Sequence, residues 1–181
     1  MKSKAPRGAH FGPATLLTLE DLMSARAETL AKQFEAKAAE MTGALEKLTD
    51  ADWKKTTGGE KWTVGVAAHH VANSHEGITG ILKTVASGKA MPAFTMDQLN
   101  EGNAKHAKEF ANCTKEETLA LHKKGAAAAA AAVRGLSDAE LDRSATVLTG
   151  MPAMTVQQMV EGILIHHVED HLGSIRKTLG H

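Results

Sequence analysis

The chain has 181 residues, of which 21 are Lys or Arg and 21 are Asp or Glu, so its formal net charge is zero. This balance gives no overall field that would attract nucleic acid or an acidic lipid surface. An aromatic content of 3% also leaves few side chains that could stack on bases. We therefore expect no nucleic-acid partner, and the length suits one domain with one core.

Targeting signals and disulfides are also not expected. Cys113 is the only cysteine, so no internal disulfide can form. The basic N-terminus is not followed by the apolar stretch of a secretion signal, and no segment approaches the roughly 20 apolar residues that cross a bilayer. We predict a cytoplasmic protein without a membrane partner, consisting of an irregular arm over residues 1–15 and one domain over residues 16–181.

The first predicted helix begins at Thr18, where Thr18 and Asp21 have capping-box spacing. Apolar residues then recur in steps of three, four or seven, which indicates a long amphipathic helix. This apolar stripe consists of Met23, Leu30, Phe34, Ala38, Met41, Leu45 and Leu48. Because the stripe carries no titratable residue, we expect this helix to form a wall of a helical bundle.

Two further long helices are predicted over residues 63–85 and 114–135, with Thr63 and Thr114 at their starts. The second contains seven consecutive alanines, which favour close helix packing because alanine is the strongest helix former and has a small side chain. Short capped turns follow Leu48 and Leu136, and a polar helical stretch over residues 96–111 is a candidate cover for an opening. The pattern indicates long crossover connections and short extra helices.

The last predicted helix is capped by Thr155 and Gln158 and extends to Leu179. At about 100° per residue, His167 and His171 fall on its apolar face and point inward together. Two imidazoles at positions i and i+4 are close enough to share a divalent metal ion. The alternative is a pair of core-edge histidines that are satisfied by hydrogen bonds.

Further histidines and polar residues lie on or near the predicted inward faces. His70 lies on the inward face of the helix over residues 63–85, as either a core histidine or a third metal ligand. His69 and His75 fall well away from that face. Asn73 and Ser74 are candidates for contacts to a ligand or substrate, His122 for a structural or substrate-side role, and Asp170 lies at the edge of the inward arc; no general base is evident. The default expectation for His10, His69, His106, His166 and His181 is a solvent-facing position.

Several motifs together resemble the DinB/YfiT superfamily of helical metalloproteins. They are Trp62-Thr63-Val64 with His70 eight residues after the Trp, Asn100-Glu101-Gly102-Asn103, the segment from Leu136 to Asp142, and the run from His167 through His171 to Ile175. The resemblance implies an all-α, up-down-down-up four-helix bundle. It also implies a metal ion held by one histidine of the second long helix and two of the last, which by motif are His70, His167 and His171. The acidic residue that the family often carries after the first of these is replaced by Ser74-His75.

Three neutral imidazoles suit zinc, nickel or iron(II), and they leave coordination positions open for water or substrate. The resemblance therefore implies an enzyme that activates a low-molecular-weight thiol or water for transfer or hydrolysis on a small molecule. Two alternatives stay open: a non-catalytic metal- or ligand-binding bundle, which the missing general base favours, and a structural protein whose histidines only pack. A ferritin-like di-iron site is disfavoured because the inward faces lack its glutamate ligands.

Assembly into a homodimer is expected from the resemblance and from apolar residues on the last helix. Ile165, Val168 and Leu172 lie outside the face that carries the two histidines. They either form a second packing surface for a partner subunit or cover neighbouring helices within the chain.

Overall fold

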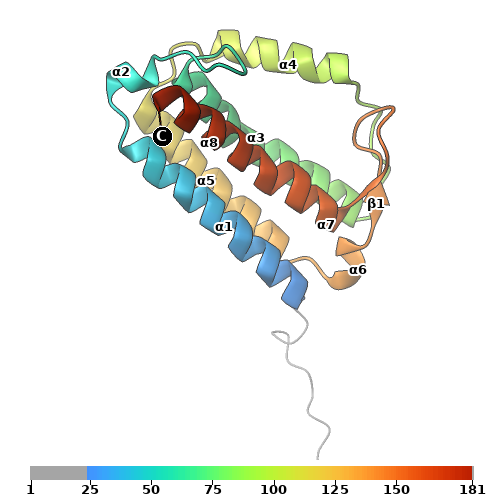
Figure 1. The fold of residues 1–181 in the computed structure, drawn as a ribbon. Helices are drawn as coiled ribbons and strands as arrows, with labels where there is room; N and C mark the ends of the chain where they lie inside the picture. The colour runs from blue at the N-terminus through green and yellow to red at the C-terminus, as the bar shows by residue number, and fades with distance from the viewer. Residues whose placement is uncertain (1–23, 181) are drawn as a thin grey trace, which may run out of the picture.

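The computed structural model describes residues 24–180 and shows a bundle of four long helices (Figure 1). The first three are α1 (Ala25–Glu46), α3 (Val64–Ala86) and α5 (Lys115–Arg134), and the fourth is continuous from α7 (Val156–Met159) through η1 (Val160–Ile165) to α8 (His166–Leu179). The first and last run in one direction and α3 and α5 in the other, which confirms the predicted up-down-down-up bundle. The predicted helix start at Thr18 lies outside the described residues. Within them, α1 begins at Ala25, with Ser24 as its N-cap.

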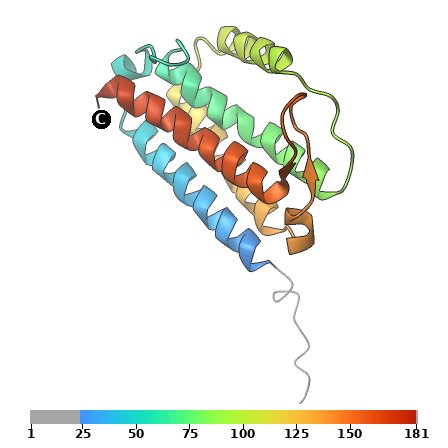
Figure 2. The same cartoon turned by 45° about the vertical axis from the view of Figure 1, so that its right-hand side comes forward.

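Parallel neighbours require a long return connection. Because α3 and α5 run in the same direction, the chain travels back along the bundle through a loop and α4 (Met96–Glu109), as Figure 2 shows. The short helices α2 (Asp50–Trp53) and α6 (Asp138–Leu141) follow α1 and α5, and a small antiparallel ribbon pairs β1 (Ser144–Ala145) with β2 (Met154–Thr155). These connections confirm the predicted crossovers and short extra helices.

Side-chain caps explain where the helices begin. The hydroxyl groups of Thr63, Thr114 and Thr155 each accept a hydrogen bond from a backbone N–H three residues further along. Gln158 returns a bond to the backbone N–H of Thr155, which completes the predicted capping box. Each cap satisfies N–H groups that have no partner within the helix, so three of the predicted helix starts are confirmed to within a residue.

The core is built against α1 and α5. The buried face of α1 carries the predicted apolar stripe from Leu30 to Leu45 and no titratable side chain, which confirms its role as a wall. On α5, Ala126, Ala129 and Ala130 are buried, and their small side chains let this helix lie close to both α1 and α3. Of the helices within residues 24–180, none is long and apolar enough to cross a membrane.

The last helix departs from regular geometry. Residues 160–165 form a π-helical segment, in which the backbone hydrogen bond reaches one residue further than in an α-helix. The wider turns keep a row of residues at intervals of four, from Val156 to Leu172, against the core, whereas a regular helix would rotate that row away. Val168 and Leu172 belong to this row, and Ile165 is buried as well. Of the two alternatives, these residues therefore cover neighbouring helices within the chain, and the homodimer stays a prediction.

The positions of three histidines differ from the prediction. His69, His75 and His106 are buried, although the first two were expected to lie away from the inward face and His69 and His106 to face solvent. The physical reason is that α3 is covered on more than one side, by α4 over His69 and by α5 over His75, so a single inward face does not describe it. His166 is exposed as expected, and His10 and His181 lie outside the described residues.

A buried histidine makes stability depend on pH. Burial, followed by the neighbouring His122, lowers the pKa of His75 from its ordinary value of 6.5 to about 3. Below pH 6.5 the unfolded chain therefore takes up a proton that the native state does not, and the free energy of unfolding falls as the pH falls. We expect the metal-free wild type to lose about 2 kcal/mol more than His75→Gln between pH 7 and 5, measured by urea denaturation, since each pH unit corresponds to about 1.4 kcal/mol. Parallel pH profiles would contradict this expectation.

Gly65 marks a close approach between α3 and α2. A β-carbon at this position would overlap the indole ring of Trp53, whose Nε1 donates to the carbonyl of Cys113 at 2.9 Å. We expect Gly65→Ala to lower the free energy of unfolding by about 1–3 kcal/mol through overpacking. The control is Gly80→Ala on the same helix, where the added carbon meets nothing within 4 Å, and which should gain up to about 1 kcal/mol from helix propensity. Equal effects of the two substitutions would refute the packing explanation.

Candidate metal centre

The structure brings His70 of α3 together with His167 and His171 of α8. One ring nitrogen from each of the three histidines lies within 4.8 Å of the others. The Nε2 atoms of His70 and His167 are 3.0 Å apart, and the rings of His167 and His171, one helical turn apart, have centroids separated by 4.7 Å. The three side chains that helical periodicity predicts to point inward therefore form one cluster.

The cluster has the spacing and protonation state that a metal ion requires. Two nitrogen ligands of a tetrahedral zinc ion lie about 3.3 Å apart, close to the observed separation of the two Nε2 atoms. Burial, followed by the neighbouring His171, lowers the pKa of His70 to about 4 and that of His167 to about 3. Both imidazoles are thus neutral at pH 7, which is the form that binds metal. The residues present fit one divalent ion with three protein ligands.

Glu60 is a site residue that the sequence reasoning missed. Its carboxylate accepts from His171 Nδ1 at 2.9 Å and from the Ser174 hydroxyl at 2.7 Å. Burial raises the pKa of Glu60, but hydrogen bonds from Ser174, its own backbone and Thr57 outweigh that effect and leave the pKa below its usual value. A carboxylate on the far nitrogen fixes the tautomer and orientation of a metal-ligating histidine.

The loop that carries Glu60 explains why it escaped notice. Residues 54–61 are polar and contain two glycines, so they show no periodicity that could point a side chain inward. In the structure this loop is closed by backbone hydrogen bonds from Thr57 to Trp62 at 2.7 Å and from Val64 to Lys55 at 2.8 Å. The only signal in the sequence was the position of Glu60 two residues before Trp62, whose indole packs against His70 and His171.

The three histidines line a cavity of about 650 Å³. Its wall is mostly apolar, and α4 contributes part of it, as expected for a segment that covers an opening. The loops after α3 and after β1 meet above it, where Thr149 N donates to the carbonyl of Phe94 at 2.8 Å. The lining side chains other than the histidines are Glu60, Trp62, Ser74, Ile78, Ile81, Phe94, Leu99, Asn100, Asn103, Ala104, Val147, Leu148 and Ile163.

The other candidate residues are distributed differently. Ser74 lines the cavity and donates its hydroxyl hydrogen bond to the backbone carbonyl of His70 at 2.6 Å. Asn73 is exposed and is not part of the lining, and Asp170 is exposed and pairs with His166 at 3.3 Å. His122 is fully buried between α5, α3 and α1, away from the cavity lining.

A second histidine pair anchors α4 beside the cluster. His69 Nδ1 and His106 Nε2 are 3.3 Å apart, and the ring of Phe110 stacks on His69 with a centroid separation of 4.0 Å. The ring of His106 also lies 5.3 Å from that of His70. These contacts join α4 to α3 beside His70 and place α4 where its asparagines reach the cavity.

The fold and site together define a four-helix-bundle protein with a candidate three-histidine metal centre, and comparison with known proteins assigns it to a family. A sequence model of the DinB superfamily matches residues 33–175, and the chain belongs to this superfamily. No protein in a search of curated proteins matches.

Solved structures share this fold at low sequence identity. YfiT from Bacillus subtilis, described as a probable metal-dependent hydrolase with an unusual four-helix bundle topology, has a TM-score of 0.66 and 19% identity over 94% of both chains. A mycothiol-dependent maleylpyruvate isomerase has a TM-score of 0.66 and 15% identity over 82% of this chain. The match spans only 60% of the length of that isomerase.

The contact between Glu60 and His171 makes metal affinity depend on a carboxylate. We expect Glu60→Ala to weaken zinc binding by about 10- to 100-fold, because His171 Nδ1 loses its acceptor. Zinc affinity can be measured at neutral pH by competition with a chelating dye. The control is Glu76→Ala, which removes an exposed carboxylate of α3 that is not part of the cavity lining. Unchanged affinity in Glu60→Ala would show that the carboxylate does not support the ligand.

Proposed function

We propose that this protein is a metal-dependent enzyme in which His70, His167 and His171 bind one divalent ion, such as zinc, nickel or iron(II). The site would activate a thiol for transfer to a small molecule, or water for its hydrolysis. The observation that carries the proposal is the convergence of three ring nitrogens within 4.8 Å at the wall of a 650 Å³ cavity. A closed structural site would bring four protein ligands and no adjoining cavity.

The residues around the cluster have definable tasks. When bound, the ion would supply Lewis acidity that lowers the pKa of a coordinated thiol or water. Glu60 holds His171 in place and is the one carboxylate of residues 24–180 that lines the cavity, so it is the candidate to accept a proton from the nucleophile. Trp62 covers the rings of His70 and His171 and excludes water from them.

The cavity wall indicates the class of substrate. Within residues 24–180, no lysine or arginine lines the cavity, and its one carboxylate is already bonded to His171 and Ser174. A carboxylate or phosphate group away from the metal would thus be desolvated without a cationic partner in this lining. Asn100 and Asn103 offer amide donors and acceptors. The substrate is a small, mainly apolar molecule whose only strongly polar end faces the three histidines.

Two relatives of known fold support the reaction types. The isomerase is described as mycothiol-dependent, which favours a low-molecular-weight thiol as a co-substrate, and YfiT is described as a probable metal-dependent hydrolase. Thiol transfer and hydrolysis both use an open metal position next to an apolar cavity.

The first test is metal content followed by turnover. We expect about one metal ion per chain in the wild type and none in His167→Ala, measured by elemental analysis of untagged protein. The matched control is His166→Ala, which removes an exposed histidine from the same helix and should keep the metal. A metal-free wild type after reconstitution at neutral pH would refute the proposal.

The second test separates an enzyme from a non-catalytic binder. The metal-loaded protein is assayed with thiols and acceptors, and with para-nitrophenyl esters of matched length that end in a methyl or a carboxylate group. We expect the neutral ester to have a kcat/KM about tenfold higher, and this activity to vanish in His167→Ala. Saturable binding without turnover across the screen would identify a binding protein.

A further inference from the structure

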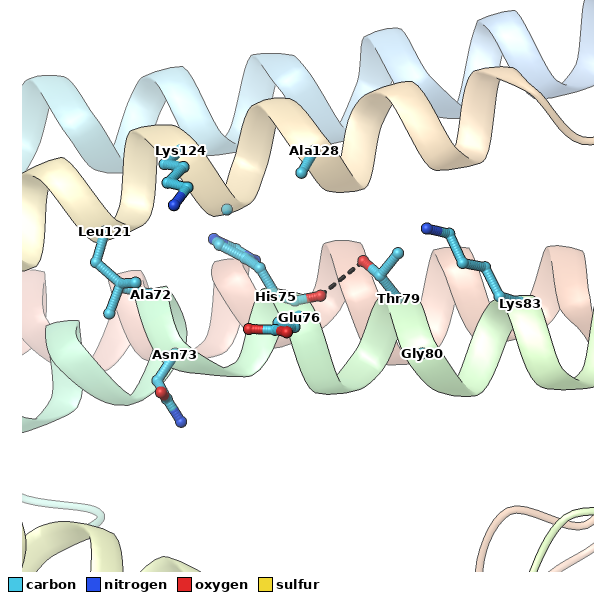
Figure 3. A pocket seen from close by; sticks show the side chains of 11 residues that line it. Ala72, Asn73, His75, Glu76, Thr79, Gly80, Lys83, Leu121, Lys124 and Ala128 are labelled. Carbon is cyan, nitrogen blue, oxygen red and sulfur yellow. Dashed lines mark hydrogen bonds between the residues drawn. The ribbon is translucent and has the colours of Figure 1, made fainter.

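Another pair of buried histidines, His75 and His122, links three helices of the bundle. His75 of α3 is 1% exposed and His122 of α5 is fully buried. His75 Nε2 and His122 Nδ1 are 3.0 Å apart, and His122 Nε2 is 3.1 Å from the carbonyl oxygen of Ala38 on α1. Figure 3 shows His75 extending from α3 toward α5, with its backbone carbonyl accepting a bond from Thr79.

The Ala38 carbonyl, at which this row of hydrogen bonds ends, determines which atom donates in each of them. A carbonyl oxygen only accepts, so the proton of neutral His122 lies on Nε2. His122 Nδ1 is then an acceptor, and His75 must donate to it from Nε2. A neutral imidazole carries one N–H, so His75 Nδ1 is left as an acceptor.

That acceptor faces the interior and has no partner in the described part of the chain. The Cδ2–Nε2 edge of the His75 ring faces α5, since Nε2 bonds His122 and Cδ2 lies 3.2 Å from the position of a β-carbon on Gly125. Nδ1 is on the opposite edge of the ring, directed away from α5. It is buried without a hydrogen-bond partner among residues 24–180.

His167 presents the complementary group. Its Nε2 is the atom next to His70, so a metal ion held there leaves the ring proton on Nδ1. This Nδ1 is also buried and unpartnered within the described residues. Because α3 and α8 pack together and run in opposite directions, His75, which follows His70 on α3, lies toward the same end of the bundle as His167, which precedes His171 on α8.

We infer that His75 is a positioning residue for His167: its Nδ1 accepts a hydrogen bond from one buried water molecule, which in turn accepts the His167 Nδ1–H. The same His75 ring donates from Nε2 to His122, and His122 donates to the carbonyl of Ala38. A water between a buried donor and a buried acceptor satisfies both, whereas either alone would stay desolvated. The inference rests on the proposed function because it assigns a task toward the metal ligand. It gives His167 the support that Glu60 gives His171.

Histidine tautomers in the wild type test the inference without any variant. Two-bond proton–nitrogen NMR spectra are recorded on protein with ¹⁵N-labelled histidine, before and after loading with zinc. We expect the proton on Nε2 of His75 and of His122 in both states, and the proton on Nδ1 of His167 after loading. A proton on His75 Nδ1 in the loaded protein would overturn the inference, since that atom could not accept.

A matched pair of substitutions tests the consequence for metal binding. An asparagine amide falls near the Nδ1 position of histidine and a glutamine amide near Nε2, so His75→Asn keeps an acceptor toward His167 and His75→Gln keeps only the donor to His122. We expect His75→Gln to bind zinc about 10- to 100-fold more weakly and His75→Asn to bind close to wild type. Equal affinities of the two variants, both retained or both lost, would overturn the inference, and circular dichroism checks that each is folded.

These outcomes are separable from those of the proposed function. A wild type that binds no zinc refutes the proposed metal centre itself. Normal zinc binding in the wild type with equal affinities of the two variants refutes only the role of His75. Zinc binding that depends on the Nδ1 acceptor supports the relay whether or not turnover is found.

Discussion

The last helix must bury one row of side chains in the core and turn a neighbouring row toward α3, and the rest of the site depends on how it does both. The row from Val156 to Leu172 packs inside the bundle, and the row that contains His167 and His171 faces α3 and the cavity. A regular α-helix rotates a four-residue row steadily away from a fixed direction. The π-helical turns over residues 160–165 cancel that rotation directly before the two histidines. Such segments are frequent at functional sites, because their irregular backbone persists only where the surrounding packing supports it.

Buried imidazoles are the second constraint, since each neutral ring brings one donor and one acceptor into an apolar interior. The bundle meets this cost by pairing them: His69 with His106, His75 with His122, and His70 with His167. The first two pairs join α3 to α4 and to α5, so they hold the covering helices at fixed positions. The third pair joins α3 to α8, and there a third ring nitrogen, from His171, lies within 4.8 Å of both, so a shared metal ion can use all three nitrogens whereas one hydrogen bond uses two. The pairs therefore divide into structural contacts and a candidate ligand set by their geometry.

Much of the fold was readable from local signals in the sequence. Capping is a contact within four residues, so the sequence alone indicates the helix starts at Thr63, Thr114 and Thr155. The alanine run predicts close packing because small side chains let neighbouring helices approach each other in any bundle. His70, His167 and His171 were found because periodicity and family motifs agreed on them. Glu60 could not be found in this way, since a loop has no period and its contact with His171 is between residues 111 positions apart. The burial of His69 and His75 likewise depends on how α4 and α5 lie over α3, and the π-helical turns depend on the whole core.

The net charge around the three histidines determines which reactants the site would favour. Among the described residues, Glu60 is the one carboxylate in the lining of the cavity, and the three imidazoles are uncharged when they bind a metal ion. A divalent ion held there would leave a net charge of about +1 facing a mostly apolar wall, in a region of low dielectric where that charge is poorly screened. An anionic thiolate or hydroxide is the complement of such a centre, whereas a second negative charge elsewhere on the substrate would find no cation in the cavity lining among residues 24–180. If His167 is supported by neutral His75 instead of by another carboxylate, the positive charge is preserved, and the site keeps its preference for a single small anion at the ion and an uncharged body beyond it.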